Sequence, residues 1–208
     1  MSPRRFFPGG RNRRPNLPPA ASGSGFRRPR LRPDRAAVCL LAALPLIAQT
    51  PKPTEYQVKA AYLSDLGRFV ETWGSTPRPS ATEPFEICVL GQDPFGSVLD
   101  AALKGEAIHG APLLAKRISH PQDAQTCRVL FIAASEAPQL DAILASLADA
   151  PVLTVGDAPD FVRRGGIIQF VLDGNKVKFE INLAASRRAG LSLSSELLKL
   201  ARVVRKTP

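Results

Sequence analysis

Three short apolar runs constrain the fold of this chain more than any other feature of its sequence. They are "EICVL" at 86–90, "CRVLFIA" at 127–133 and "PVLTV" at 151–155, and segments with apolar residues at helical spacing separate them. Apolar runs without alternation are typical of strands that are covered on both faces. Because strands and helices alternate along the chain, the pattern predicts an α/β fold of three layers, a mostly parallel sheet flanked by helices.

The neighbouring segments predict the other elements of one compact domain of about 155 residues. Thr54 and Gln57 match a capping box that opens the first helix. Further along, the patterns predict a helix at 93–103, a strand at 112–118 and a helix at 138–148. Five large residues of the first helix recur at helical spacing and are interpreted as core: Val58, Tyr62, Leu66, Phe69 and Trp73.

The last third of the chain predicts a C-terminal antiparallel hairpin followed by two helices. An Asp-Gly turn divides residues 165–182 into two strands, the second of which alternates apolar and polar side chains. Asn182 is expected to cap a short helix over 183–189 that stops at Gly190. A final helix from Ser194 is expected to carry one apolar stripe, formed by Leu197, Leu200, Ala201 and Val204.

The positive charge of the chain is confined to its first 48 residues. The whole chain carries a formal charge of +10, and residues 1–48 hold ten arginines against one acid, Asp34. These residues therefore carry +9, which leaves +1 on the other 160 residues. A strongly basic domain would suggest nucleic acid or an anionic membrane as a partner, but a nearly neutral folded part predicts neither.

The basic segment leads into "AAVCLLAALPLIAQ" at 36–49, which has the order of regions of a secretory signal. About a dozen apolar residues are too few to span a bilayer permanently. We therefore expect a leader over 1–48 that is disordered in its first thirty residues, and a periplasmic domain over 49–208 without a permanent membrane anchor. The alternative for the apolar run is a buried core helix.

Two cysteines, Cys88 and Cys127, remain after cleavage, an even number in an oxidising compartment. Three interpretations stay open at this point: a disulfide, two buried free thiols, or two ligands of a metal ion. His109 and His120 lie at no spacing that a zinc motif requires, so we expect both in solvated loops. The residues therefore favour a disulfide and predict no metal site.

The turn "GQDPFG" at 91–96 joins a predicted strand to a predicted helix, where α/β proteins often hold phosphate. It lacks the glycine spacing of a dinucleotide site and the Gly-Lys-Ser/Thr of a phosphate loop. We interpret Asp93 as the helix N-cap and Pro94 as the first helical residue. This stretch is therefore expected to bind nothing.

Catalytic motifs are missing from the sequence, which has no hydrolase elbow, no metalloprotease motif and no cysteine beside an activating histidine. Asp93, Asp157 and Glu180 could form a carboxylate cluster, yet each also fits as a cap or a surface charge. The sequence therefore predicts a protein that is not an enzyme and that uses no cofactor.

Four blocks of the sequence resemble the YfiR-like family of secreted bacterial proteins. They are "AAYLSDLGRFVETW", "PFEICVLGQDPFGSVLD", "CRVLFIAASE" and a long block that runs from "PVLTVGDAPDFVRRGG" to "ELLKLARVV", so the resemblance covers 56–204. It implies an α/β periplasmic repressor that forms homodimers. Such a repressor acts by protein contact on an inner-membrane diguanylate cyclase and is relieved by an outer-membrane lipoprotein.

The resemblance also bears on the cysteines. Cys88 and Cys127 match one disulfide pair of the family pattern, whereas the second pair of the family has no counterpart in this chain. The resemblance therefore implies at most a structural bridge, without control by oxidation.

The resemblance further implies where the functional surface lies. In the family's namesake the corresponding C-terminal region contributes a surface and a pocket that contact a partner. Adjacent guanidinium groups beside apolar residues suit such an interface, and the alternative is a solvated charged face over core leucines. The partner or ligand surface expected here comprises Glu180, Leu183, Arg187, Arg188, Leu191 and Leu193.

Three functions follow as hypotheses. The first is a periplasmic regulator that contacts a membrane signalling protein such as a diguanylate cyclase. The second is a periplasmic small-ligand sensor that serves a different membrane receptor or kinase, and the third is an unrecognised enzyme. A membrane diguanylate cyclase encoded beside this chain would favour the first, and a histidine kinase or an outer-membrane receptor would favour the second.

Export yields the first testable prediction. Because positive charge precedes a short apolar run, we expect cleavage between Ala48 and Gln49. N-terminal sequencing of protein from the periplasmic fraction should therefore read from Gln49. A cytoplasmic product that retains the leader arginines would contradict the prediction.

Overall fold

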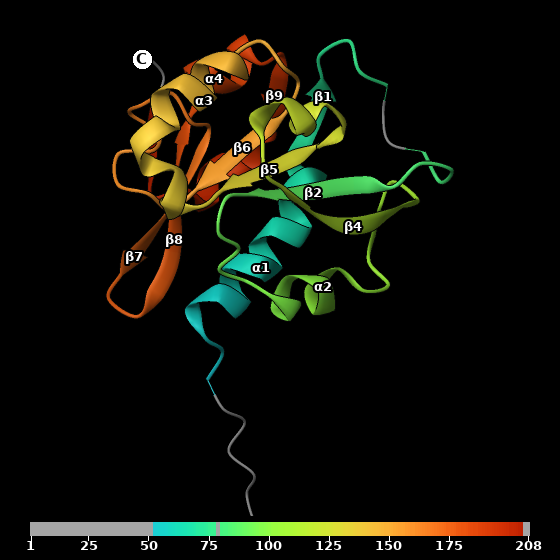
Figure 1. The fold of residues 1–208 in the computed structure, drawn as a ribbon, viewed down its shortest axis with the longest axis horizontal. Coiled ribbons are helices and arrows are strands. Elements are labelled where there is room, and N and C mark those ends of the chain that lie inside the picture. Colours follow the sequence, from blue (N-terminus) through green and yellow to red (C-terminus); the bar gives the residue numbers. More distant parts are fainter. Residues whose placement is uncertain (1–51, 78–79, 206–208) are drawn as a thin grey trace, which may run out of the picture. The chain divides into compact units, whose positions relative to one another are not determined.

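The computed structural model describes residues 52–77 and 80–205, and its centre is one mixed sheet. The strand order is β10-β8-β7-β6-β5-β2-β4-β3 (Figure 1). Neighbours pair in parallel except for β7 with β8 and β3 with β4. The predicted α/β fold with a mostly parallel sheet and a C-terminal hairpin is therefore confirmed. The strands are β2 (Phe85–Leu90), β3 (Ala107–Ile108), β4 (Ala111–Ile118), β5 (Val129–Ile132), β6 (Leu153–Gly156), β7 (Ile168–Asp173), β8 (Lys176–Asn182) and β10 (Val203–Arg205).

Helices cover the two faces of this sheet (Figure 1). Ile87 of β2 packs in one hydrophobic cluster with Leu63 and Leu99, whose helices lie on the first face. The next residue, Cys88, packs in a second cluster with Ile143 on the opposite face. The strand is thus buried on both sides, which explains its apolar run. The helices are α1 (Glu55–Leu66), α2 (Ser97–Leu103), α3 (Leu140–Ser146), α4 (Leu183–Arg188) and α5 (Ser195–Leu200).

The first helix begins as the sequence predicts and ends earlier than predicted. Thr54 and Gln57 form the capping box, since each side chain accepts a hydrogen bond from the backbone N–H of the other. The chain leaves α1 at Leu66 and enters strand β1 (Val70–Trp73), so Trp73 does not continue the helical stripe. It is still core, because β1 pairs with β9 (Leu191–Leu193) and buries the indole against Phe85.

The second helix starts later than predicted. Asp93 is not its N-cap, because the Asp93 carboxylate accepts a hydrogen bond from the Phe95 N–H at 2.7 Å within a tight turn. Gly96 follows with a φ of 52°, a left-handed conformation that glycine tolerates, and α2 begins at Ser97. Pro94 therefore precedes the helix, and the predicted cap at this position is wrong.

The final helix is shorter than predicted. Ser194 caps α5 as expected, and its hydroxyl accepts a hydrogen bond from the Leu197 N–H at 3.3 Å. The helix ends at Leu200, because the chain then extends as β10 along the edge of β8 and the Arg202 N–H donates to the Phe179 carbonyl. The predicted stripe is therefore wrong after Leu197: Leu200 is the last helical residue but is 61% exposed, and Ala201 and Val204 lie beyond the helix.

The hairpin and the helix after it match the sequence analysis. β7 and β8 turn through Gly174, whose φ of 60° suits glycine. The Asn182 side chain caps α4 by accepting a hydrogen bond from the Ala185 N–H at 3.0 Å. Gly190 follows the helix with a φ of 72°, which ends α4 as predicted.

Cys88 and Cys127 form a disulfide, with their Cα atoms 5.8 Å apart. The bond joins β2 to the start of the segment that becomes β5, and both cysteines are buried. Of the three interpretations left open by the residues, the disulfide is confirmed.

The predicted leader, residues 1–48, lies outside the described part of the chain, so its signal function stays a prediction. None of the helices in the described part has the length and the apolar character needed to cross a bilayer.

The disulfide yields the second prediction. It closes a loop of 39 residues, so its removal should lower the free energy of unfolding by about 4 kcal/mol on the chain-entropy model. Thermal unfolding with and without dithiothreitol should show a lower Tm for the reduced wild type. The control is the Cys88→Ala/Cys127→Ala variant, whose Tm should not respond to reductant. An unchanged wild-type Tm after verified reduction would contradict the prediction.

Candidate functional site

The structure divides the predicted partner surface into a core part and an exposed part. Leu183, Leu191 and Leu193 are at most 9% exposed and belong to the hydrophobic core. Arg187 and Arg188 lie in the last turn of α4 and are exposed. The leucines therefore hold α4 and β9 against the core, and the two arginines are what a partner can reach.

Glu180 lies apart from these arginines in the sequence and on a different element. It is half-buried on β8, opposite Gln169 of β7 on one side and Val203 of β10 on the other. Its side chain points away from the face that buries Phe179, as the alternating pattern predicts. Whether Glu180 takes part in a common surface with α4 stays a prediction.

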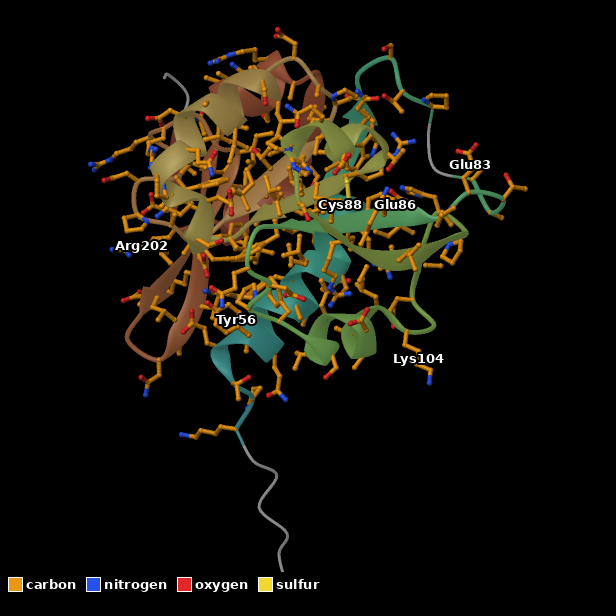
Figure 2. All side chains as sticks on the ribbon, in the orientation of Figure 1. Tyr56, Glu83, Glu86, Cys88, Lys104 and Arg202 are labelled. Carbon is orange, nitrogen blue, oxygen red and sulfur yellow. A yellow bond between two sulfur atoms is a disulfide. The ribbon has the colours of Figure 1, made fainter. Side chains whose placement is uncertain are left out.

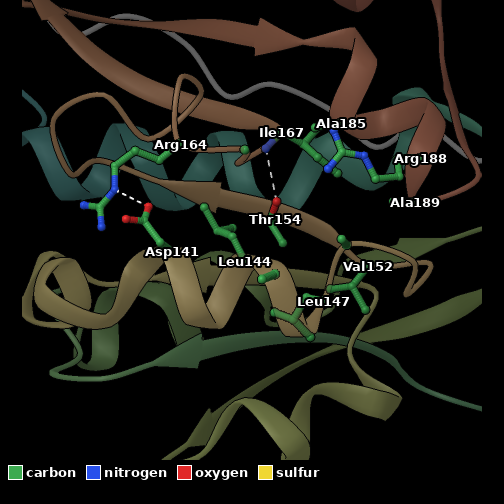
Figure 3. A pocket seen from close by; sticks show the side chains of 13 residues that line it. Asp141, Leu144, Leu147, Val152, Thr154, Arg164, Ile167, Ala185, Arg188 and Ala189 are labelled. Carbon is green, nitrogen blue, oxygen red and sulfur yellow. Dashed lines mark hydrogen bonds and ion pairs between the residues drawn. The ribbon is translucent and has the colours of Figure 1, made fainter. Parts of the chain in front are cut away.

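A groove lies between α3 and α4 (Figure 3). It has a volume of about 160 Å³. Arg188 borders it from α4, while Arg164 and Asp141 lie at its other end, joined by an ion pair of 2.6 Å. Between them the lining is largely apolar, with Leu144 and Ile167 among its residues. We call this the α4 groove.

A second site lies at the carboxyl end of β6, where Asp157 follows the strand. Asp157 Oδ2 lies 2.6 Å from Lys59 Nζ, and the same ammonium group lies 2.5 Å from Glu55 Oε1. The Tyr56 hydroxyl donates to Asp157 at 3.3 Å, and the ring of Tyr56 lies 4.5 Å from Lys59 Nζ. These four residues form the Lys59 cluster.

The electrostatics of the Lys59 cluster follow from its burial. Lys59 is 3% exposed, and burial alone would lower its pKa. Hydrogen bonds to Asp157 and Glu55 outweigh this effect and hold the pKa of Lys59 above its ordinary value. Burial, together with the nearby Asp157 carboxylate, raises the pKa of Tyr56. Lys59 is therefore a fixed cation, and Tyr56 keeps its proton.

The Lys59 cluster borders a hollow of about 430 Å³. The hollow lies beside the carboxyl ends of β5 and β6, where Ala134 and Asp157 line it, and beside Gln169 and Phe170 of β7. Ligands of open α/β sheets bind at this edge. Two carboxylates face one ammonium group there, so the hollow has a net negative charge and favours a neutral or cationic small ligand.

The turn at 91–96 holds no free cation for a phosphate. Arg117 is the cation nearest to it, and its guanidinium binds Asp93 at 2.9 Å, Asp100 at 2.7 Å and the Gly96 carbonyl at 2.8 Å. Gly91 packs against Ser135 so closely that a Cβ would lie 2.5 Å from the Ser135 hydroxyl oxygen. Side chains thus surround the turn itself, and whether it binds a ligand stays a prediction.

The imagined carboxylate cluster is not formed. Asp93 pairs with Arg117, Asp157 pairs with Lys59, and Glu180 lies on β8. Asp157 therefore belongs to a different charge cluster, and its partner Lys59 is not among the residues that the sequence predicts as functional. The available signals were a carboxylate directly after an apolar strand and a lysine within the apolar stripe of the first helix.

Two of the three glycines in the segment "VGDAPDFVRRGG", Gly156 and Gly166, lie against one aromatic ring. Phe161 is fully buried, and a Cβ on Gly166 would lie 2.1 Å from its ring. A Cβ on Gly156 would lie 2.5 Å from the same ring. The ring therefore packs between these two glycines, and this packing fixes the loop that carries Asp157.

One group of potential metal ligands occurs within the described residues: Glu86, Cys88 and Cys127. The two sulfur atoms are bonded to each other, so they are not thiolates. The Glu86 carboxylate already binds the Lys116 ammonium group at 3.2 Å. This chemistry does not fit a metal site.

The Lys59 cluster yields the third prediction. Lys59→Met leaves the Asp157 carboxylate buried without its cation, so it should lower the free energy of unfolding by about 3 kcal/mol. In urea unfolding, the Lys59→Met/Asp157→Asn double variant should lose less free energy of unfolding than the two single variants lose in sum, because the two charges are coupled. Arg68→Met is the control, since its ion pairs are exposed and are worth at most about 1 kcal/mol.

The Lys59 cluster also predicts how the stability of the fold depends on pH. The pKa of Lys59 is higher in the folded protein than its unfolded value of 10.5, so the ammonium group stabilises the fold fully below that value. The contribution is lost as the pH rises through the folded pKa. The gap in Tm between wild type and Lys59→Met should therefore be constant at neutral pH and narrow above pH 10.5. A gap independent of alkaline pH would contradict this account.

Two solved structures are similar to this chain. A conserved domain protein from Vibrio cholerae O1 biovar El Tor strain N16961 matches with a TM-score of 0.50 and 13% identity over 73% of this chain and 60% of that one. An ABC domain from Streptococcus pneumoniae, solved in complex with L-Trp, matches with a TM-score of 0.47 and 12% identity over 72% and 60%. The chain thus spans about 60% of the length of each, and the first likeness supports the α/β fold alone.

A family profile covers nearly the whole described domain. The YfiR/HmsC-like family, DUF4154, matches residues 56–202. The match includes α1 from Tyr56 onward, the central sheet except β10, and α4. Of the Lys59 cluster it includes Tyr56, Lys59 and Asp157 but not Glu55. On this evidence, the chain belongs to the YfiR/HmsC-like family.

Proposed function

We propose that this protein is a periplasmic regulator that acts by protein contact on a membrane signalling protein. Membership of the YfiR/HmsC-like family over 56–202 supports a regulatory role, and the signal-like leader supports export. The observation that carries the proposal is the pair Arg187 and Arg188, which is exposed on α4 within the family match, with Arg188 at the border of the α4 groove.

The chemistry of this surface suits a protein partner. Arginine is enriched in interfaces because its planar guanidinium pairs with carboxylates through two hydrogen bonds. Arg188 borders a groove with apolar walls, which can take an apolar side chain of the partner while the arginines pair with its acids. The buried leucines Leu183 and Leu191 keep α4 in place, so the surface is preformed.

The partner we propose is an inner-membrane signalling protein, with a diguanylate cyclase as the specific case. An outer-membrane lipoprotein that competes for the regulator, and homodimers of the regulator, belong to the same proposal. No catalysis by this chain is part of it.

A second candidate function is small-ligand sensing for a different membrane receptor or kinase. The hollow at the Lys59 cluster favours it, because it lies at the carboxyl edge of the sheet and has a volume of about 430 Å³. Under this hypothesis, ligand binding beside Asp157 would change the surface that the receptor contacts.

The fourth prediction tests the proposed surface. Arg187→Ala and Arg188→Ala should leave the Tm nearly unchanged, because both side chains are exposed, and should weaken partner binding by roughly 1–2 kcal/mol or more at a hot spot. Glu180→Ala is expected to act in the same direction. Deletion of the chain should raise cellular cyclic di-GMP, wild type should restore it, and the arginine variants should restore it only in part.

The matched control is Lys104→Ala, an exposed cation after α2 that lies away from α4. A photo-crosslinker at position 187 should capture the membrane cyclase, whereas the same crosslinker at position 104 should not. Full restoration by both arginine variants would place the functional surface elsewhere. Unchanged cyclic di-GMP after deletion would favour the sensor.

A further inference from the structure

A third hollow opens at the end of the sheet where β2 and β5 begin. It has a volume of about 370 Å³, which is within the range of small-molecule sites. Figure 2 shows Glu83 and Glu86 on the side of the domain where it lies. Its lining includes Thr76, Glu83, Glu86, Thr126, Cys127 and Arg128, and we call it the Arg128 hollow.

Arg128 is held rigidly at this position by the sheet. Its backbone N–H donates to the Glu86 carbonyl at 2.9 Å, and its own carbonyl accepts from the Leu153 N–H at 2.9 Å. The guanidinium carbon lies 5.7 Å from the centre of the Trp73 ring. Arg128 is therefore fixed between β2 and β6, and its side chain rests against an aromatic face.

The guanidinium of Arg128 uses few of its five N–H donors. Nη2 donates to the Pro77 carbonyl at 2.9 Å. Nη1 is buried and has no hydrogen-bond partner within residues 52–77 and 80–205. Burial lowers the pKa of Arg128, and the charge of Glu83 acts against this effect from beyond ion-pair distance. A buried donor without a partner costs stability and is rare in native proteins.

The other charges of the Arg128 hollow do not supply the missing acceptor. Glu86 accepts hydrogen bonds from the Lys116 ammonium group and from the Thr126 hydroxyl. Glu83 is exposed and makes no ion pair with Arg128 in the structure. The hollow thus presents the guanidinium of Arg128, whose pairing is incomplete, beside the Glu86 carboxylate, which Lys116 already neutralises.

We propose that the Arg128 hollow binds a small organic carboxylate, which pairs with the guanidinium of Arg128. A carboxylate accepts charge-assisted hydrogen bonds from a guanidinium, and the incompletely used donors of Arg128 can supply them. The methylene groups of the ligand lie against Pro84 and Pro151, which also line the hollow. This site is distinct from the α4 groove, and the proposal holds whichever partner the regulator contacts.

The fifth prediction uses Trp73, the single tryptophan of the chain, as a reporter at the site. Its intrinsic fluorescence in the exported protein should change saturably on titration with succinate, against sodium chloride of equal ionic strength. Arg128→Gln should weaken the apparent affinity about tenfold or more, since it removes a charge-assisted pair. Arg202→Gln is the matched control, because Arg202 is exposed and lies on the other side of the domain (Figure 2), and it should leave the affinity unchanged.

Two further measurements keep the proposal falsifiable if Arg128→Gln proves unstable. Glu83→Gln replaces an exposed side chain and removes a negative charge from the hollow, so it should tighten succinate binding by a few-fold. Inorganic phosphate at the same concentration should bind more weakly than succinate. A response that is equal in wild type and Arg128→Gln, a Glu83→Gln variant that binds no better, or binding of phosphate alone would overturn the assignment.

Discussion

The structure depends on the burial of its central strands on both faces. β2, β5 and β6 carry apolar side chains into two separate hydrophobic clusters, and the polar exceptions are Glu86 of β2 and Thr154 of β6. Parallel pairing satisfies their backbone groups, and helices on either side exclude water. The Lys59 cluster and the Arg128 hollow accordingly lie at the two ends of these strands.

Charged side chains are paired to different degrees at the two ends of the sheet. At the carboxyl end, Lys59 is nearly enclosed and is bound by two carboxylates, and Arg117 is bound by two more. At the opposite end, Arg128 keeps an unpaired donor, and Arg187 is exposed to solvent. Ion pairs thus hold helix α1 and the turn before α2 in place at the carboxyl end. At the opposite end, Arg128 and Arg187 can still pair with the acidic groups of a partner.

Local patterns predicted most of the elements, and competition from distant parts of the chain explains the errors. The capping box at Thr54 and the hairpin through Gly174 depend on neighbours in sequence, so both could be predicted. Trp73 and Val204 follow helical spacing, yet each lies in a strand. The reason is pairing with a distant strand, β9 in the case of Trp73 and β8 in the case of Val204. Tertiary pairing overrides spacing in such segments.

The candidate sites were harder to predict than the fold. Lys59 and Asp157 are 98 residues apart, and no spacing rule links them. The incomplete pairing of Arg128 depends on the loop that brings Pro77 to it, which is a property of the folded chain alone. The position of Arg187 and Arg188 came from a family resemblance, and the structure added that the leucines beside them are core.

The two edges of the sheet bear on how copies of this protein behave at high concentration. At one edge, the short β10 covers β8. At the other, β3 pairs with only two residues of β4, and the rest of the β4 edge carries Lys116 and Arg117, with Arg117 tied down by Asp100. Charged, partly covered edges are poor templates for an added strand. The fold thus resists the edge-to-edge growth by which exposed sheets aggregate.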